Sequence, residues 1–463
     1  MKRCKKLKLE EKLKFEFELP DCVMSYIFSM LSLKDLVKTS ALSKRWIYEW
    51  RLRMDLNFDL HNMFDNNTIQ GLPIPLPFFQ GFHFQSEFAT RLDQFMLHYQ
   101  GHAIRSIRLD FPLCNHHTDL IDRLISKGIA KGVKRIELLL SKQKNIFRYT
   151  YMPLSPYTFP LTLLSDSLTY LHLQNCFLAE PTDFSGLKNL TTIVLDGLYA
   201  TLSSSVLSHL FFECLQLEHA TFKNCKLVGG SVKITSPKLR HLKIINCHWS
   251  DTPDKIFVDA LNLSSFEYSG TTTKISVVAP RLLKVFWDSA TTPRTPRPLS
   301  TIARLTHIEN LAMIISPSQV EKITETLVQF QNLRQLDLLI EGAYNPNMDH
   351  FWILDITMAS QYLQQLSLTI RNPRQRHSHM NGVKMQKREY AGFSHNNLKY
   401  VKFCGCVSHV NVIELASNLL RNASSLKKMT FNGCGGFQRE REHNVIHKML
   451  KEEVNEQCQL IIL

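Results

Sequence analysis

The clearest structural pattern in this chain is in residues 168–176, Leu168-Thr169-Tyr170-Leu171-His172-Leu173-Gln174-Asn175-Cys176. Leucine occupies its first, fourth and sixth positions, and a cysteine follows three residues after the last leucine. The same arrangement returns along most of the remaining chain. A fixed apolar pattern that returns many times indicates a repeat architecture, in which each unit buries its apolar face against its neighbours.

The core pattern of the repeat is Leu-x-x-Leu-x-Leu, with apolar substitutes. Clear copies begin at Leu168, Leu190, Leu239, Leu333 and Leu363. Weaker copies begin at Ile104, Val133, Leu217, Leu263, Ile308, Leu398 and Leu426. Such copies predict a leucine-rich-repeat solenoid with one short strand per unit in a parallel sheet on the concave face. Their irregular spacing predicts variable outer connections, and the concave sheet is the usual binding surface of such arrays.

Cysteine follows several copies at the position where leucine-rich repeats place asparagine or cysteine. These residues are Cys176, Cys225, Cys247, Cys406 and Cys434. We expect each side chain to pack inward and to satisfy backbone groups at the turn after the strand. This placement accounts for the cysteines without a metal or a disulfide framework, and it favours free, largely buried thiols in the reducing cytoplasm and/or nucleus.

The composition is that of an ordinary folded protein. The chain has 463 residues, of which 44% are hydrophobic and 21% are charged, and a formal charge of +14. The charge is diffuse, so a main role in nucleic-acid binding is not favoured. No apolar run reaches the ~18 residues that a membrane helix requires, so no membrane partner is expected. The basic start, Met1–Lys6, leaves open a nuclear address or a solvated tail.

A short helical module precedes the repeats. Leu19-Pro20-Asp21 is typical of a helix start, because proline suits the first turn and aspartate favours the positive helix end. A second helix is predicted from Lys34-Asp35, and a third from Ser43, which is a good N-cap. Three helices in about 30 residues bury little surface alone. From the pattern alone, the module is either a cap on the solenoid or a docking site for a partner.

The ordered residues of this module resemble the F-box signature. They are Leu19-Pro20, Ile27, Met30-Leu31, Asp35-Leu36 and Leu42-Ser43-Lys44-Arg45-Trp46. The resemblance implies docking on the Skp-family adaptor of a cullin–RING ubiquitin ligase. It places six residues in or beside that interface: Leu19, Pro20, Ile27, Leu31, Leu36 and Leu42. It implies that Trp46 braces the module internally. Met30 departs from the family, which often has leucine there, and this change conserves volume.

The last repeats bear a second resemblance. Four segments are similar to the FBD region, which follows F-box and leucine-rich units in many flowering-plant proteins: Asn397–Phe403, Glu414-Leu415-Ala416, Leu419–Ala423 and Leu426–Phe431. The resemblance covers roughly residues 390–435 and suggests a plant F-box/leucine-rich-repeat protein. It leaves the role of this region open.

These observations divide the chain into five segments. The predicted boundaries are 1–17 for a basic tail, 18–60 for the F-box-like module, 61–100 for a connector and first cap, 101–389 for the solenoid, and 390–463 for the FBD-like repeats and cap. The fold class is therefore α/β, with an N-terminal three-helix module followed by an irregular solenoid.

Motifs for catalysis and cofactors are absent from the sequence. It contains no glycine-rich phosphate loop, Gly-x-Ser-x-Gly elbow or His-Glu-x-x-His motif. The nearest metal candidates are Cys404-Gly405-Cys406 with His409 and Cys114-Asn115-His116-His117, and neither has a partner pair at zinc spacing. We therefore expect a non-catalytic protein without cofactor or metal.

The leading hypothesis is a substrate-recognition subunit of a Skp–cullin–F-box ubiquitin ligase, with the repeats holding an unknown target protein. The alternatives are an interaction scaffold whose front helices are only a cap, and a small-molecule receptor of the F-box/leucine-rich-repeat type. Receptors of related plant architecture hold a ligand and an inositol phosphate in the solenoid, but the sequence shows no convergent Arg/Lys cluster.

Overall fold

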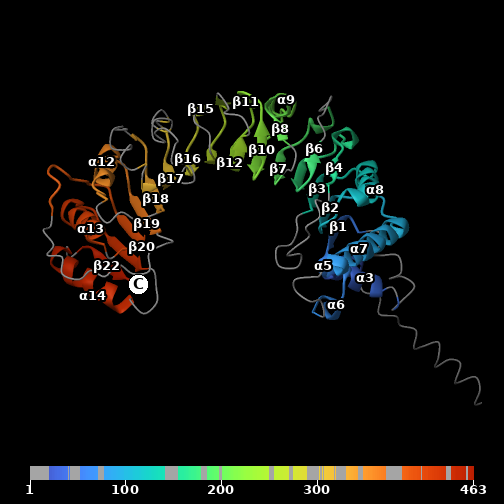
Figure 1. The fold of residues 1–463 in the computed structure, drawn as a ribbon, viewed down its shortest axis with the longest axis horizontal. Helices are drawn as coiled ribbons and strands as arrows, with labels where there is room; N and C mark the ends of the chain where they lie inside the picture. Colours follow the sequence, from blue (N-terminus) through green and yellow to red (C-terminus); the bar gives the residue numbers. More distant parts are fainter. Residues whose placement is uncertain are drawn as a thin grey trace, which may run out of the picture. The chain divides into compact units, whose positions relative to one another are not determined.

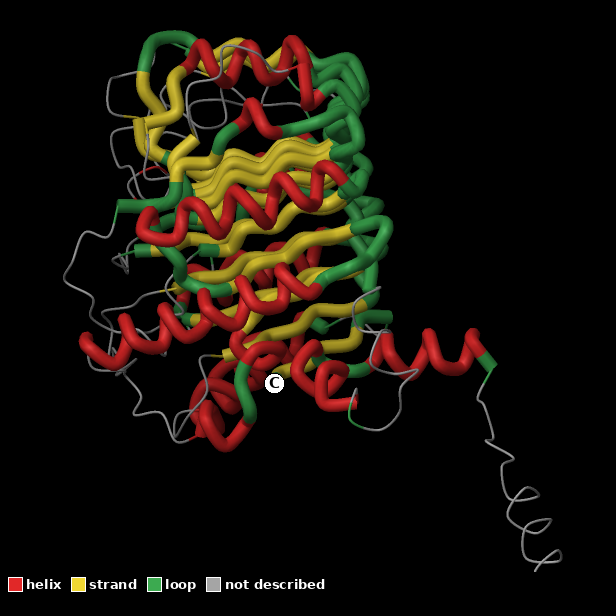
Figure 2. The backbone as a smooth tube through the Cα atoms, turned by 90° about the vertical axis from the view of Figure 1, so that its right-hand side faces the viewer, coloured by secondary structure: helices red, strands yellow, loops and turns green. Residues whose placement is uncertain are grey.

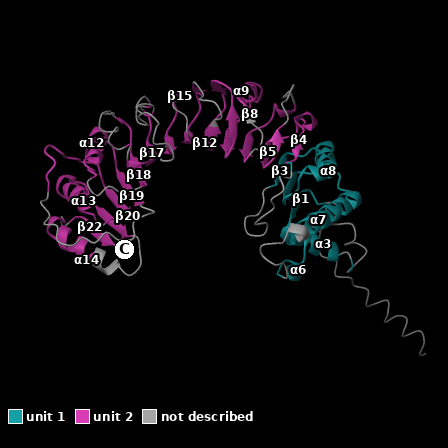
Figure 3. Ribbon diagram, viewed as in Figure 1, with its two compact units in different colours: residues 1–155 teal, residues 156–463 magenta. Residues whose placement is uncertain are grey.

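The chain forms two compact units, residues 1–155 and residues 156–463 (Figure 3). This computed structural model describes residues 20–39, 41, 53–70, 78–140, 155–178, 185–197, 201–249, 255–270, 275–288, 302, 305, 307–317, 319, 330–342, 348–371, 388–407, 409–433, 439–454 and 457–463. The division falls inside the predicted solenoid segment 101–389, at a place that the repeat pattern does not mark.

The first unit combines helices with three parallel strands (Figure 1). Its elements are α2 (Asp21–Met30), α3 (Leu33–Thr39), β1 (Asp55–Asp59), α5 (Leu60–Met63), α6 (Asn66–Gln70), α7 (Phe78–His98), β2 (Ser106–Asp110), η2 (Asn115–His117), α8 (Thr118–Ala130) and β3 (Arg135–Leu139). Leu56 of β1 lies beside Ile107 of β2, which lies beside Ile136 of β3. All three are at most 1% exposed, so they form the centre of this sheet's core.

Helix α7 covers the sheet with a stripe of aromatic side chains. Phe84, Phe88 and Phe95 are buried at helical spacing along α7. The ring of Phe88 stacks on that of Phe111 at 3.9 Å between centroids, and Phe95 meets Phe58 edge to face at 5.3 Å. These ring pairs fix the helix against the strands.

The second unit is built on a longer parallel sheet (Figure 2). Among the described residues, twelve strands pair in chain order: β5 (Tyr170–Gln174), β7 (Thr192–Asp196), β9 (His219–Lys223), β12 (His241–Trp249), β14 (Ser265–Gly270), β16 (Lys284–Asp288), β17 (Asn310–Ile315), β18 (Gln335–Glu341), β19 (Gln365–Arg371), β20 (Tyr400–Gly405), β21 (Lys428–Gly433) and β22 (Gln459–Ile462). Every one of these pairings is parallel.

Short elements precede these strands or connect them. They are β4 (Thr158–Phe159), η3 (Leu161–Leu163), β6 (Phe177–Leu178), η4 (Ser185–Leu187), β8 (Thr201–Ser203), α9 (Ser204–Glu213), β10 (Lys226–Val228), β11 (Val232–Thr235), β13 (Ile256–Asp259), β15 (Ile275–Val278), α12 (Trp352–Ala359), α13 (Val410–Asn422), α14 (Arg439–Leu450) and η5 (Lys451–Glu453). Some connections hold helices, whereas β11, β13 and β15 form a small parallel sheet of their own. The predicted variability of the connections between strands is thus confirmed.

The sequence pattern located most of the parallel strands. Each of its twelve copies coincides with a described strand, β2 and β3 in the first unit and ten strands in the second. In the two long ladders it missed β1, β16 and β22, and it did not predict the short strands of the connections. In and just before β16, the buried residues Leu282, Val285 and Trp287 keep the spacing of the pattern with apolar substitutes, so this strand could have been predicted as a weaker copy.

The turn after several strands uses a left-handed residue followed by a buried cysteine. Asn175, Asn224 and Asn246 have φ of 55°, 51° and 52°, which only glycine and asparagine adopt readily. The next residue is Cys176, Cys225 or Cys247, each at most 1% exposed. The Cys225 thiol donates to the carbonyl oxygens of Lys223 at 3.2 Å and Leu195 at 3.4 Å. The predicted inward packing and backbone bonding are confirmed at this position.

The prediction for the other two cysteines has a different outcome. Cys406 follows Gly405, which has φ of 83°, but its side chain is only partly buried. The prediction of inward packing is therefore wrong for Cys406. Gly405 approaches the Ile370 carbonyl so closely that a Cβ atom would collide with it, and this crowding dictates glycine at the turn. Cys434 lies outside the described residues.

Candidate protein-interaction surfaces

Two helices of the front module are described, and local contacts explain where each of them begins. Pro20 directly precedes α2, and its carbonyl accepts from the Val23 N–H at 2.9 Å. Ser32 precedes α3 as a capping residue, because its hydroxyl accepts from the Asp35 N–H at 3.2 Å. The predicted starts of these two helices are confirmed to within one residue. The predicted third helix, with Trp46, lies outside the described residues.

The predicted adaptor contacts lie in different environments. Pro20 is exposed, and Ile27 and Leu31 are half-buried. Leu36 is 1% exposed, so its side chain packs inside the first unit. Leu19 and Leu42 lie outside the described residues.

Helix α2 presents an apolar face to solvent, which we call the α2 face. Its residues Val23, Tyr26 and Met30 are 39%, 66% and 71% exposed. They stand three and four positions apart, so they share one side of the helix. The helical spacing was visible in the sequence at Val23 and Met30, but pattern alone could not tell an exposed stripe from a buried one.

Helix α3 is held to the first strand–helix unit of the fold. The Leu33 N–H donates to Oδ1 of Asn62 at 3.3 Å, and Nζ of Lys34 donates to the Phe64 carbonyl at 2.6 Å. Lys38 pairs with Asp65 at 2.6 Å on the surface. The front module is therefore attached to the repeat scaffold through α3, whereas Val23 and Met30 of α2 stay exposed.

A partly apolar groove of about 600 Å³ lies beside this attachment. It is lined by residues of α3, α5 and α7, including Val37, Met63 and Phe95, with Lys34, Lys38 and Arg91 among its polar groups. Arg91 Nη1 donates to the Met63 carbonyl at 2.5 Å and its guanidinium lies 4.4 Å from the centre of the Phe64 ring. These contacts brace the wall of the groove.

The second unit offers a broad open sheet face, which consists of the strand residues that alternate with the buried apolar ones. Its middle row, one residue per strand, runs His172, Val194, Thr221, Lys243, Glu267, Phe286, Ala312, Asp337, Ser367, Lys402, Thr430 and Ile461. None of these side chains is fully buried. The row mixes apolar, polar and both kinds of charged side chains, as a surface for a specific protein partner requires.

Some neighbours on the open sheet face pair with one another. Nζ of Lys243 lies 2.8 Å from Oε1 of Glu267 on the next strand. The imidazole rings of His219 and His241 stack at 4.7 Å. Burial is the main cause that lowers the pKa of His241, so this ring favours its neutral form.

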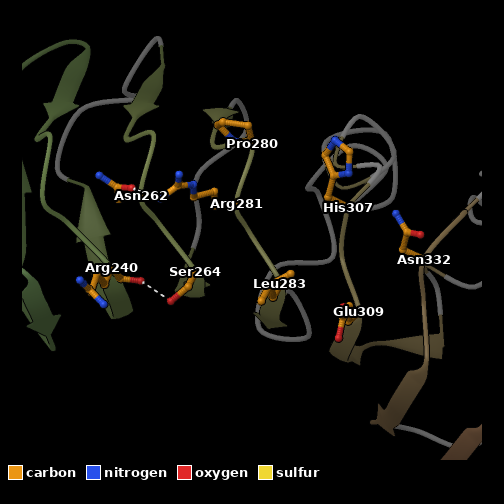
Figure 4. Close-up of a pocket in the computed structure, with 9 residues that line it drawn as sticks. All are labelled: Arg240, Asn262, Ser264, Pro280, Arg281, Leu283, His307, Glu309 and Asn332. Carbon is orange, nitrogen blue, oxygen red and sulfur yellow. Dashed lines mark hydrogen bonds between the residues drawn. The ribbon is translucent and has the colours of Figure 1, made fainter.

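A groove of about 620 Å³ runs along the edge where strands β12 to β18 begin (Figure 4). Arg240, Arg281, His307 and Glu309 line it. Nη1 of Arg281 donates to Oδ1 of Asn262 at 2.7 Å, which orients the guanidinium along the groove. The site is open and polar, so it suits contact with a protein surface better than enclosure of a small molecule.

The FBD-like repeats contain a buried polar network. Glu414 and Asn418, from the buried side of α13, are 4% and 3% exposed. Nε of Arg388 donates to Glu414 at 3.0 Å, and Nδ2 of Asn418 donates to the Arg388 carbonyl at 3.0 Å. The Tyr390 N–H donates to Oδ1 of Asn418 at 2.9 Å. The Glu414-Leu415-Ala416 motif therefore tethers the segment that enters β20 to α13.

The cysteines and histidines do not form a reactive or metal-binding centre in the described part of the chain. Burial raises the pKa of the Cys176 and Cys214 thiols to about 12, so they remain protonated. Cys114 lies 3.9 Å from Nδ1 of His117, as the spacing allowed. Across the described ranges, no three His, Cys, Asp or Glu side chains come together as a metal site would require.

We searched the described helices for one that could cross a membrane. Within the residues described, no helix combines the length and the apolar character needed to cross a bilayer.

Comparisons with known proteins agree with the two resemblances in the sequence. The F-box domain profile matches residues 17–51, and the profile described as the At1g61320/AtMIF1 LRR domain matches residues 95–459. The F-box match includes α2 and α3. The repeat match runs across all the strands from β2 to β21.

Relatives in Arabidopsis thaliana combine the same parts. The F-box protein At3g60790 is 28% identical over 56% of this chain, and the match spans about half of that relative (51%). The FBD-associated F-box protein At1g66310 is 24% identical over 90% of this chain and 89% of its own length. The F-box/FBD/LRR-repeat protein At4g00160 is 24% identical over 90% of this chain and 85% of its own length.

The fold and these matches define a plant F-box/leucine-rich-repeat protein with an FBD-like C-terminal region. More particularly, the chain belongs to the At1g61320/AtMIF1 leucine-rich-repeat family, whose profile covers most of its length.

Proposed function

We propose that this chain is the non-catalytic substrate-recognition subunit of a Skp–cullin–F-box ubiquitin ligase, acting in the cytoplasm and/or nucleus. Residues 18–60 bind a Skp-family adaptor and, through it, a cullin–RING ligase. The repeats of 101–389 and the FBD-like segment 390–463 hold a target protein. The chain would then contribute proximity, because it brings the target's lysines near a ubiquitin-conjugating enzyme.

The α2 face is the observation that supports adaptor binding. Val23 and Met30 are exposed apolar residues, 39% and 71% exposed, on a helix inside the F-box match. Exposed apolar stripes on a helix are typical of protein interfaces. Three of the residues predicted to contact the adaptor border this face: Pro20, Ile27 and Leu31. For Leu19 and Leu42, contact with the adaptor stays a prediction. Leu36 is buried and supports the interface through packing.

A scaffold with a helical cap is the second candidate. The bonds from Leu33 to Asn62 and from Lys34 to Phe64 attach α3 to the first repeat, as a cap would require. The two candidate functions differ in the role of the α2 face. Adaptor binding requires this face, whereas a cap does not.

Co-purification with a plant Skp-family adaptor tests the proposal. The full-length chain is co-expressed with the adaptor, beside a Val23→Asp, Met30→Asp variant. We expect the native chain to retain the adaptor and the variant to lose it, because central apolar anchors contribute ~2 kcal/mol or more each. Leu97→Asp is the control, since Leu97 is 74% exposed on α7 of the same unit. Failure of the folded native chain to retain the adaptor leaves the scaffold as the better account.

A further inference from the structure

Four lysines gather on the two adjacent strands β20 and β21 of the FBD-like repeats. Lys402 lies within β20 and Lys428 begins β21, and both are exposed. Lys399 and Lys427 immediately precede the same strands and are backbone neighbours, because the Lys427 N–H donates to the Lys399 carbonyl at 2.9 Å. Lys402 is the register partner of Thr430, and Lys428 is that of Tyr400, so Lys402 and Lys428 are diagonal neighbours ~7–8 Å apart. We call the four lysines the basic patch.

Two lysines of the patch, Lys402 and Lys428, belong to the open sheet face at the C-terminal end of the second unit, and Lys399 and Lys427 lie at the edge where the two strands begin. Val401, Phe403, Met429 and Phe431 are at most 2% exposed, and the rings of Phe403 and Phe431 stack at 4.9 Å. Strand residues alternate between the two faces of a sheet. Lys402 and Lys428 therefore lie on the face opposite this core, together with Tyr400, which is 44% exposed and is the register partner of Lys428.

The surroundings of the patch do not neutralise its charge. Lys243, on the same open sheet face, has its own carboxylate partner in Glu267. The register partners of Lys402 are Ser367 and Thr430, and those of Lys428 are Tyr400 and Gln459, none of which is acidic. Among the described residues, no salt bridge reaches any of the four lysines. A compact cluster of like charges in neutral surroundings attracts a partner of opposite charge.

We propose that this basic patch binds an acidic polypeptide segment of the target protein. The lysines of β20 and β21 pair with its carboxylates, and the ring of Tyr400 supplies an apolar contact between them. This inference rests on the proposed function, because it describes the chemistry of the target that the repeats hold. It assigns target binding to the FBD-like region and predicts association that weakens with salt.

Fluorescence anisotropy with a labelled twelve-residue peptide rich in glutamate and tyrosine tests this assignment. The protein is the full-length chain in complex with its adaptor, so that loss of peptide binding and loss of adaptor binding are scored separately. We expect Lys402→Glu with Lys428→Glu to weaken peptide binding by at least about tenfold, because like charges replace the pairs. The same peptide with glutamine in place of glutamate should bind at least about tenfold more weakly to the native chain.

The matched control is Lys226→Glu with Lys233→Glu. These two exposed lysines belong to β10 and β11 of the same unit, so the control makes the same charge change away from the patch. Near-native binding by this control supports the assignment. Equal loss in both double variants, unchanged binding in the patch variant, or preference for duplex DNA or inositol hexakisphosphate over the peptide would overturn it.

Discussion

Nε and Nη2 of Arg388 lie 3.0 and 2.9 Å from the same oxygen of Glu414, whose side chain is only 5% exposed. The guanidinium also covers the Phe351 ring at 4.7 Å. Hydrogen bonding to Glu414 is the main cause that raises the pKa of Arg388. The pair joins the segment that precedes β20 to α13, so it helps to position the strands that hold the basic patch.

Removal of this arginine should destabilise the second unit. Arg388→Ala leaves a carboxylate buried without its ionic partner, and such truncations cost about 2–3 kcal/mol when the remaining charge is mostly shielded from water. Hydrogen exchange of peptides from α13, measured on the full-length chain, should show the loss as faster exchange. Arg334→Ala is the control, because Arg334 meets Glu309 at 3.8 Å with both side chains well exposed. An exposed pair contributes ~0–1 kcal/mol, so equal effects of the two variants would refute the argument.

The left-handed turn residues predict different effects for substitution by alanine and by glycine. Asn224 has φ of 51° and donates to Oδ1 of Asp196 at 2.9 Å. Asn224→Ala should lower the free energy of unfolding by about 1–2 kcal/mol. Alanine is strained at a positive φ, and it cannot make the hydrogen bond to Asp196. Asn224→Gly loses only the bond and should be milder. Urea titrations of both variants check the order, and an alanine variant as stable as the glycine variant would contradict it.

Much of the fold could be predicted because each strand of the array repeats one local rule. Leu171 and Leu173 face the core in β5, and the same two positions are buried in β18 as Leu336 and Leu338. Strand β16 keeps the spacing with apolar substitutes and could have been predicted, whereas β1 and β22 have Arg53 and Gln457 at the first position of the pattern. Burial depends on shape in the folded state, whereas the pattern recognises only residue type.

The candidate surfaces were less predictable because exposure is a tertiary property. Leu36 and Met30 look equivalent in the sequence as apolar residues at helical spacing, but one is 1% and the other 71% exposed. The basic patch was also hidden. Lys402 and Lys428 are 26 positions apart in the chain, and only the pairing of β20 with β21 brings their strands together.

His350 should make the second unit sensitive to acid. Its ring is 1% exposed, and among the described residues neither ring nitrogen has a hydrogen-bond partner. Burial is the main cause that lowers its pKa to about 4; the charge of Asp349 opposes this shift, and the charge of His409 adds to it. Unfolding frees the ring to bind a proton below its ordinary pKa of 6.5. The stabilisation is therefore complete above pH ~6.5 and is lost as the pH falls towards ~4.

The measurement is the unfolding free energy of the full-length chain at pH 7 and pH 5. His350→Leu should be at least as stable as the native chain at pH 7, because it removes buried polar atoms that lack partners. It should lose about 2 kcal/mol less than the native chain between pH 7 and pH 5. His102→Leu, at an exposed position of the first unit, is the control. Parallel pH profiles for the native chain and the His350 variant would show that this ring is not the acid-sensitive group.

Leu36 and Met30 should separate the stability of the F-box module from its binding. Leu36 is buried, so Leu36→Ala creates a cavity and should destabilise the first unit by about 2–4 kcal/mol. Met30 is mostly exposed, so Met30→Ala should leave stability within about 0.5 kcal/mol of the native value. If the α2 face binds the adaptor, Met30→Ala weakens adaptor affinity without a change in unfolding. Calorimetric titration of both folded variants with the adaptor measures the affinity. Unchanged affinity in Met30→Ala would remove this residue from the interface. A change in both affinity and unfolding free energy would make it a packing residue.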